Sequence, residues 1–295
     1  MTKCAFNYEE TFMGVREKKP ESFLVRFKDD YRLFSLVKTV PSGKTRMLDV
    51  GCGGGSLTES LPYYFPQAAI YGCDVSSTAI AYAKKLGSGK VHYATIKNKK
   101  FPYKNSFFDV CICFDVLEHV PDVDFFLREV KRVLKKNGNF FLIVPCEGER
   151  FTYTWFFHKL NIGKNLTYRY FGHIHPEFTY KYVIELLKKH AFTIRKKTYS
   201  EHMFYQLFQL VIYFIPKILL EIVLGDKKAK QYSDSHVIKY SQKKRDPLLI
   251  LRKLWFLFMS LARYPMYWET VILKHLPFGA WKLHILARKT ESNRK

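Results

Sequence analysis

Short apolar runs alternate with amphipathic stretches along residues 45–200. The apolar runs predict buried strands, and the stretches between them, with apolar positions three and four residues apart, predict helices. Strands that alternate with helices are typical of a parallel sheet covered by crossover helices. The predicted strands are Arg46–Val50, Ala69–Cys73, Val91–Ala94, Phe108–Phe114, Asn139–Val144 and Phe192–Thr198, and the predicted helices are Ser56–Phe65, Ser76–Leu86, Val123–Leu134 and Thr179–His190.

Local signals set some of the predicted boundaries. Ser76 is a plausible N-cap for the second helix, and Asn137-Gly138 predicts a stop after the third. Upstream, Glu21–Val40 has apolar residues at helical spacing and predicts a helix that covers the sheet.

The pattern changes after residue 200. Met203–Leu224 and Leu248–Leu273 are long, aromatic and apolar, and a loop with seven Lys or Arg and three Asp joins them, Gly225–Asp246. Trp281–Lys289 again predicts a strand. We therefore divide the chain into an N-terminal covering helix (1–44), an α/β core (45–199), a helical aromatic and basic insertion (200–277), and a final strand with a basic tail (278–295).

Composition narrows the function classes. With 47% hydrophobic and 25% charged residues, the 295-residue chain can bury a large core, which excludes a disordered or fibrous protein. The net charge of +23 predicts attraction to polyanions, either nucleic acid or an anionic membrane. Six cysteines without a CxxC pair indicate reduced, buried thiols, and the polar N-terminus lacks a signal-peptide core, so we predict a cytoplasmic protein.

A glycine cluster follows the first strand directly. In Asp49-Val50-Gly51-Cys52-Gly53-Gly54-Gly55 the glycines stand between a strand and a helix, where backbone can approach a ligand closely. Asp74 ends the next strand, 23 residues after Gly51, and is well placed to accept hydrogen bonds from ribose hydroxyls. No Gly-Lys-Ser/Thr follows, which excludes a P-loop, and Ser56 occupies the third glycine position of the dinucleotide pattern.

These residues resemble class I S-adenosylmethionine-dependent methyltransferases. LDVGCGGGSL and YGCDVS are similar to the first two motifs of that family, and FPYKNSFFDVCICFDVLEHV with LREVKRVLKKNGNFFLIVP is similar to later motifs of its small-molecule, type 11-like branch. The resemblance implies a doubly wound, seven-stranded Rossmann-like sheet. Its last strand, for which Trp281–Lys289 is the match, would run antiparallel beside the fifth, after the helical insertion.

The resemblance also implies a cofactor site for S-adenosylmethionine. Asp49, Gly51 and Gly53 would cradle its methionine part, Asp74 would hold the ribose hydroxyls, Val75 would lie against the adenine, and Phe114 and Asp115 would close the pocket. One position departs from the family. Lys97 stands where relatives carry an acidic residue on the adenine amine, so Asn98 or a backbone carbonyl would have to accept that hydrogen bond.

Three histidines are candidate catalytic residues. His119 follows the fourth strand, and its ordinary pKa suits it to accept a proton from an acceptor hydroxyl; the alternative is that it only shapes the pocket. His173 and His175 would belong to a substrate lid or act as second bases, the alternative being a plain surface loop. We assign no metal ligands.

A divalent metal is nevertheless a rival interpretation. The Asp115-x-x-Glu118-His119 pattern resembles small-RNA 2′-O-methyltransferases and ubiquinone-pathway O-methyltransferases, some of which hold a divalent metal with a further histidine downstream. His173 or His175 would complete such a set here.

The insertion bears on the substrate. Lys217 and Glu221 lie within the first apolar segment and Pro216 would kink it, which argues against a membrane span. Amphipathic helices on an anionic membrane surface fit better, as 17 Lys or Arg against 7 acidic residues follow residue 199. We therefore predict methyl transfer to a hydrophobic or lipid-linked small molecule by a protein peripheral to the inner face of a membrane. The alternatives are a soluble lid or dimer interface, an RNA methyltransferase, and an inactive cofactor-binding adaptor.

Overall fold

The computed structural model describes residues 31–160, 166–215 and 264–290, together with positions 219, 225 and 261. Several predicted features lie outside these residues. They are Cys4, the first ten residues of the predicted covering helix, the basic loop after Gly225, most of the second apolar segment, and the basic tail from residue 291.

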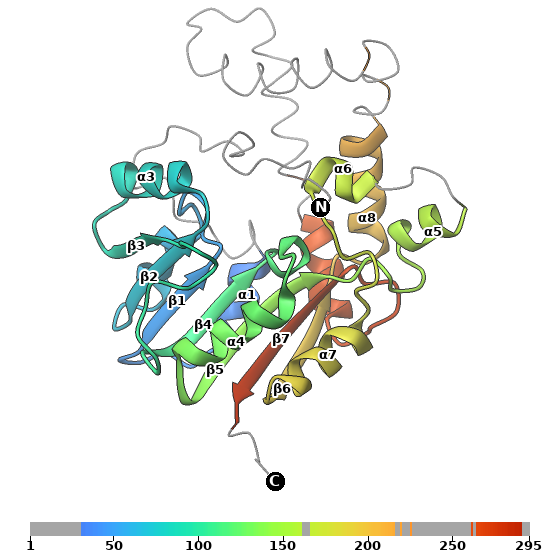
Figure 1. Ribbon diagram of the computed structural model, residues 1–295. Helices are drawn as coiled ribbons and strands as arrows, with labels where there is room; N and C mark the ends of the chain where they lie inside the picture. Colours follow the sequence, from blue (N-terminus) through green and yellow to red (C-terminus); the bar gives the residue numbers. More distant parts are fainter. Residues whose placement is uncertain are drawn as a thin grey trace, which may run out of the picture.

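A single seven-stranded sheet forms the centre of the described fold, with the strand order β3-β2-β1-β4-β5-β7-β6 (Figure 1). Neighbouring strands among β1 to β5 pair in parallel, whereas β7 pairs antiparallel with both β5 and β6. The predicted fold class, including the antiparallel last strand, is confirmed. The strands are β1 (Arg46–Val50), β2 (Ala69–Asp74), β3 (Val91–Thr95), β4 (Phe108–Phe114), β5 (Leu134–Pro145), β6 (Phe192–Ser200) and β7 (Lys282–Lys289).

Helices cover both faces of the sheet. On one face α4 (Val123–Val133) and α7 (Tyr180–Lys189) pack against buried strand residues, and they lie in front of the sheet in Figure 1. On the other face a second buried cluster joins the sheet to α1 (Tyr31–Val37), α2 (Leu61–Tyr64) and α3 (Ser77–Leu86). This arrangement is the two-sided burial that a parallel sheet requires.

The ends of the helices show which local signals were decisive. Ser76 caps α3 as predicted, since its hydroxyl accepts a hydrogen bond from the backbone N–H of Ala79 at 3.1 Å. The predicted helix Ser56–Phe65 is instead a 3-10 turn, η2 (Thr58–Ser60), followed by the short α2. The stop predicted at Asn137-Gly138 is wrong: α4 ends at Val133, and the pair lies in the irregular start of β5.

Short helices extend from the carboxyl end of the sheet. Two of them, α5 (Tyr153–Lys159) and α6 (Leu166–Phe171), follow β5 and were not predicted. After β6 come α8 (Met203–Gln209) and the π-helical turn η4 (Leu210–Phe214), and residues 264–273 are helical. Within the described residues, no helix is long and apolar enough to cross a membrane.

Candidate active site

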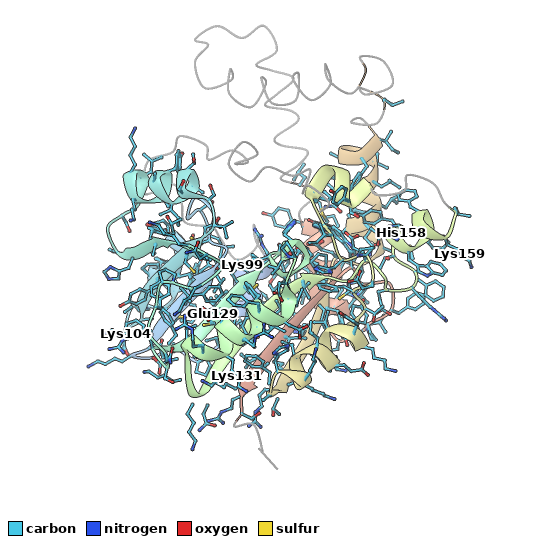
Figure 2. All side chains as sticks on the ribbon, in the orientation of Figure 1. Lys99, Lys104, Glu129, Lys131, His158 and Lys159 are labelled. Atoms are coloured by element: carbon cyan, nitrogen blue, oxygen red, sulfur yellow. The ribbon has the colours of Figure 1, made fainter. Side chains whose placement is uncertain are left out.

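A cavity of about 370 Å³ opens at the carboxyl ends of β1, β2 and β4. That edge of a parallel sheet is where ligands bind in open α/β folds. Figure 2 shows Lys99, one of the lining residues, on this side of the sheet, whereas Lys104 and Lys131 lie toward the opposite edge. The lining residues are Val50, Gly51, Asp74, Val75, Ile96, Lys99, Phe101, Asp115, Val116, His119, Val120, Pro121, Asp122, Phe125 and Phe126.

The glycine loop forms one wall of this cavity. Gly51 has a φ of +78°, and a Cβ at this position would lie 2.3 Å from Cγ2 of Val116, so the loops after β1 and β4 can approach only because the residue is glycine. Gly53 also has a positive φ, +52°, and open space lies where its Cβ would be. That space is available to a ligand.

Asp74 lies at the end of β2 beside this loop. One carboxylate oxygen accepts the backbone N–H of Gly53 at 2.8 Å, and the other accepts that of Ser76 at 2.9 Å. These two hydrogen bonds hold the carboxylate at the edge of the cavity that Asp74 lines. Val75, the next residue, lines the cavity and is 58% exposed, which suits contact with a flat apolar ring.

Three predicted site residues are not among the residues that line the cavity: Asp49, Gly53 and Phe114. Asp49 is buried and accepts a hydrogen bond from the Thr58 hydroxyl at 2.7 Å, which ties β1 to the turn η2. Burial raises the pKa of Asp49 to about 7. Phe114 is buried against Phe141 on the face that α1 covers.

The loop after β3 carries Lys97 where an acidic residue was expected. Lys97 and Lys100 form an isolated β-bridge, which turns the chain through Asn98 and Lys99, both at positive φ. As a result Lys99, together with Ile96, lines the cavity.

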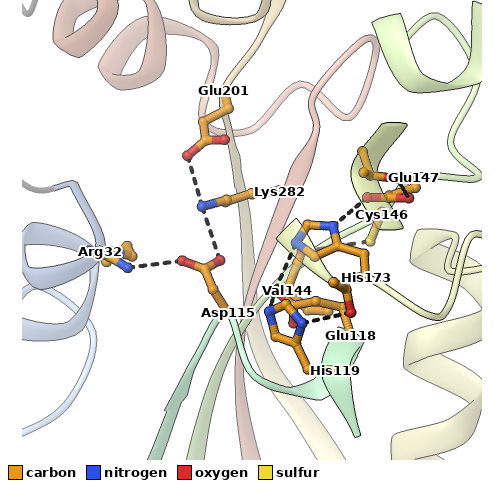
Figure 3. A network of polar contacts seen from close by, with 12 residues as sticks. Arg32, Asp115, Glu118, His119, Val144, Cys146, Glu147, His173, Glu201 and Lys282 are labelled. Atoms are coloured by element: carbon orange, nitrogen blue, oxygen red, sulfur yellow. Dashed lines mark hydrogen bonds and ion pairs between the residues drawn. The ribbon is translucent and has the colours of Figure 1, made fainter. Parts of the chain in front are cut away.

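Asp115 sits at the end of β4 in a left-handed conformation, with a φ of +52°. Its carboxylate is paired with Arg32 of α1 at 3.0 Å and with Lys282 of β7 at 3.0 Å (Figure 3). Lys282 also pairs with Glu201 at 3.1 Å. Although burial opposes ionisation, the two cations hold the pKa of Asp115 well below its usual range. Three residues of this network were not predicted as site residues: Arg32, Lys282 and Glu201. A lysine inside the apolar run of β7 is the sequence signal that could have identified Lys282.

His119 lies on the next turn, η3 (Leu117–His119), and lines the cavity. Its Nδ1 is 3.0 Å from the carbonyl oxygen of Gly172. A carbonyl can only accept, so Nδ1 carries the proton and Nε2 carries the lone pair. Burial lowers the pKa of His119 to about 4, which keeps the ring neutral.

Glu118 and His173 complete a buried cluster with His119 (Figure 3). Nε2 of each histidine lies 3.9 Å from the same carboxylate oxygen of Glu118. Glu118 is 1% exposed, and among the described residues neither of its carboxylate oxygens has a hydrogen-bond partner. Burial, reinforced by Asp115, raises its pKa well above the usual value. A carboxylate and two imidazoles within 4.8 Å of one another could hold a divalent cation.

Two residues of the expected metal set lie apart from this cluster. Asp115 is occupied by Arg32 and Lys282. His175 is occupied at both ring nitrogens, with the Glu177 carboxylate 2.8 Å from Nδ1 and the Val120 carbonyl oxygen 2.9 Å from Nε2. His175 therefore ties the loop after α6 to the loop after η3.

Comparison with known proteins agrees with this geometry. Residues 48–142 match a family described as "Methyltransferase domain". Among curated proteins, the chain is 36% identical over 116 residues to the ubiquinone biosynthesis O-methyltransferase of Pelagibacter ubique, a match covering 38% of this chain and 46% of that protein. It is 38% identical over 105 residues to the protein of the same name from Pseudomonas paraeruginosa, covering 34% and 44%. The match thus spans less than half the length of these relatives.

Solved structures share the fold. The cyclase SpnF aligns with a TM-score of 0.54 and 17% identity, covering 89% of this chain and 80% of that one. The phosphoethanolamine N-methyltransferase 2 of Haemonchus contortus, solved with S-adenosylhomocysteine, aligns with a TM-score of 0.51 and 18% identity, covering 89% and 52%. At such identity the likeness shows the fold alone.

Proposed function

Because residues 48–142 form a class I S-adenosylmethionine-dependent methyltransferase domain, we propose that this protein transfers a methyl group from S-adenosylmethionine to a hydroxyl of a hydrophobic or lipid-linked small molecule. One observation carries the proposal. A single cavity is lined by the glycine loop, by Asp74 and by His119, whose Nε2 is unprotonated. Methyl transfer to oxygen needs a cofactor cradle and a proton acceptor in one enclosed space.

The residues at the cofactor end fit S-adenosylmethionine. Asp74 lines the cavity and its carboxylate can accept hydrogen bonds from ribose hydroxyls, and the apolar side chains of Val75 and Ile96 suit an adenine ring. The open space at Gly53 would receive the methionine part. The bound cofactor supplies an electrophilic methyl group on a sulfonium.

At the acceptor end His119 acts as the general base. Transfer of the methyl group from the sulfonium to the acceptor oxygen would release the hydroxyl proton, which Nε2 of His119 would accept. The hydrogen bond from Nδ1 to Gly172 holds the ring in the tautomer that this step requires. A base of this kind contributes roughly 10²–10⁴-fold to the rate.

A second form of the mechanism is favoured by the orphaned carboxylate of Glu118. In this form Glu118, His119 and His173 would hold a divalent cation, and His119 would be a ligand instead of the base. Such a cation would act as a Lewis acid on the acceptor hydroxyl and lower its pKa.

The choice of a hydrophobic acceptor rests on two supports. The curated relatives are named for ubiquinone biosynthesis. In addition, large apolar side chains are exposed after β6, on α8 and on the helical residues 264–273; among the most exposed are Met203, Leu207, Trp268 and Ile272. We propose that this surface contacts an anionic membrane, from which the acceptor enters the cavity.

Transfer of tritium from methyl-labelled S-adenosylmethionine into total lipid and total RNA of a host extract tests this function. We expect label in lipid, and a decrease of roughly 10²-fold or more with His119→Gln while cofactor affinity stays near that of the wild type. Label confined to RNA would favour the RNA methyltransferase alternative. Cofactor binding without label in any extract fraction would favour an inactive adaptor.

A further inference from the structure

Glu147 is a buried carboxylate that the proposed chemistry does not yet use. It follows the end of β5 and is 1% exposed. One oxygen, Oε2, accepts a hydrogen bond from the Thr167 hydroxyl of α6 at 2.7 Å, and the other, Oε1, makes a very short contact with Nδ1 of His173 (Figure 3). Burial alone disfavours a carboxylate, so the deep burial of Glu147 requires an explanation.

The contact with Glu147 fixes which nitrogen of His173 faces the cluster. With Nδ1 directed at Glu147, Nε2 is the atom that lies 3.9 Å from Glu118. The ring is also confined by its neighbours, since its centroid lies 5.0 Å from that of His119, 5.4 Å from that of Phe171 and 6.1 Å from that of Trp281. His173 therefore has one orientation available.

The unpartnered oxygens of Glu118 point independently to a ligand at this place. Both are buried and lack a hydrogen-bond partner among the described residues, and Oε1 lies 3.9 Å from Nε2 of His173 and 3.9 Å from Nε2 of His119. A metal-bound histidine usually directs its second nitrogen at a carboxylate or carbonyl, which sets its tautomer and strengthens it as a ligand. Glu147 provides this for His173, and the Gly172 carbonyl provides it for His119.

We infer that Glu147 is a positioning residue that holds Nε2 of His173 ready to bind a divalent cation together with Glu118 and His119. This inference rests on the cation form of the proposed function. Thr167 extends the arrangement, since its hydroxyl on α6 orients the Glu147 carboxylate. This hydrogen bond therefore couples the position of α6 to the orientation of His173 in the proposed cation site.

Binding of Mn²⁺ to the whole 295-residue chain tests the inference without requiring a substrate. We expect the wild type to bind Mn²⁺ when free ion is followed by electron paramagnetic resonance. Glu147→Gln keeps the size of the side chain but removes its charge, and it should weaken binding about 10–100-fold. Glu149→Gln is the matched control, because this carboxylate accepts the backbone N–H of Tyr180 instead of contacting His173. The Glu149→Gln variant should bind Mn²⁺ like the wild type.

If the role of Glu147 is purely structural, Glu147→Gln will lower the free energy of unfolding without changing the Mn²⁺ affinity of the folded protein. Equal Mn²⁺ affinity of Glu147→Gln and the wild type would overturn the inference and leave the proposed methyl transfer untouched. Absence of Mn²⁺ binding by a wild type that still transfers methyl groups would overturn both the inference and the cation form, leaving His119 as the base. If Glu147→Gln does not fold, Thr167→Val decides, because it keeps the carboxylate but removes its anchor: weaker binding supports the inference and unchanged binding contradicts it.

Discussion

Three ionisable residues within a five-residue stretch show how much the surroundings of a side chain decide its charge. Asp115 is ionised because Arg32 and Lys282 pair with it. Glu118, three residues later, is buried without such partners, and its pKa is raised. His119 is kept neutral by burial. A neutral imidazole has a lone pair that can bind a metal or accept a proton, and the lowered pKa makes His119 a weaker base than an ordinary histidine.

Asp49 makes the stability of the protein depend on pH. Its pKa of about 7 in the folded protein exceeds the ordinary aspartate pKa of 3.8, so the folded state retains a proton that the unfolded chain loses. This stabilising contribution is complete below about pH 4 and is lost as the pH rises through about 7. We expect Asp49→Asn, which mimics the protonated acid, to reduce the decline in the free energy of unfolding over that range by an amount on the order of 4 kcal/mol.

Urea unfolding at several pH values measures this effect. Asp109→Asn is a suitable control, because Asp109 pairs with Lys135 and its pKa is lowered. An Asp49→Asn variant with the same decline as the wild type would contradict the raised pKa.

Asp74 should govern affinity for the cofactor. We expect Asp74→Ala to weaken binding of S-adenosylhomocysteine about 100-fold or more, since it removes the ribose partner and also the acceptor that holds Gly53 and Ser76. Calorimetric titration provides the measurement. Asp122→Asn, at another residue lining the cavity, should bind within a few-fold of the wild type, and similar losses in both variants would argue against a specific role for Asp74.

At the scale of secondary-structure elements, the loops after β1 and β4 meet through Gly51 and Val116. We expect Gly51→Ala to destabilise the protein by more than the roughly 1–2 kcal/mol of a left-handed alanine, because the new Cβ also collides with Val116. Gly89→Ala is the matched control, as Gly89 has a φ of +76° and open space around its Cβ position. Thermal unfolding that shows equal losses for both variants would contradict the close approach.

Most strands were predictable from sequence because they are compact apolar runs, whereas β6 contains the basic residues Arg195, Lys196 and Lys197. The predicted ends lie close to the observed ones. The exception is β5, which begins at Leu134 because its first residues pair with β4 across a bulge, and bulges leave no clear pattern. The helical periodicity of Ser56–Phe65 predicted one continuous helix, but a 3-10 turn interrupts it. Asp49 of β1 anchors this turn through a tertiary hydrogen bond, which the local sequence pattern does not indicate.

Gly51, Asp74 and Val75 line the cavity, and their position at its edge could be predicted because each ends or directly follows β1 or β2. The acceptor end could not be predicted in full, since Asp115, Arg32 and Lys282 come from three distant parts of the chain. The same holds for Glu147, which meets His173 only after α6 folds back over β5. Nothing in the spacing of these residues encodes their contact.

At the scale of the whole molecule, the apolar side chains after β6 lie on connected elements. The carboxylate of Glu269 accepts the backbone N–H groups of Phe204 at 2.6 Å and Tyr205 at 3.1 Å, which joins α8 to the helical residues 264–273. Met203, Leu207 and Ile272 on these elements are 73%, 56% and 72% exposed. So much exposed apolar area on adjoining elements indicates an interaction surface.

We expect the triple variant Met203→Glu, Leu207→Glu, Ile272→Glu to bind anionic vesicles at least about tenfold more weakly than the wild type. The added carboxylates oppose both insertion into the lipid and attraction to it. Co-sedimentation with phosphatidylglycerol vesicles provides the measurement. Tyr63→Glu on α2, a residue that is 66% exposed, should leave binding unchanged. Undiminished binding of the triple variant would place the membrane contact elsewhere on the protein.

The central claim is that one cavity holds the cofactor at the glycine loop and Asp74 and presents its reactive end to His119. A crystal structure of the complex with S-adenosylhomocysteine tests this claim most directly. We predict ribose hydroxyls within hydrogen-bond distance of Asp74, adenine beside Val75, and the sulfur facing the side of the cavity that His119 lines. A ligand bound outside this cavity, or one whose sulfur faces away from His119, would contradict the account.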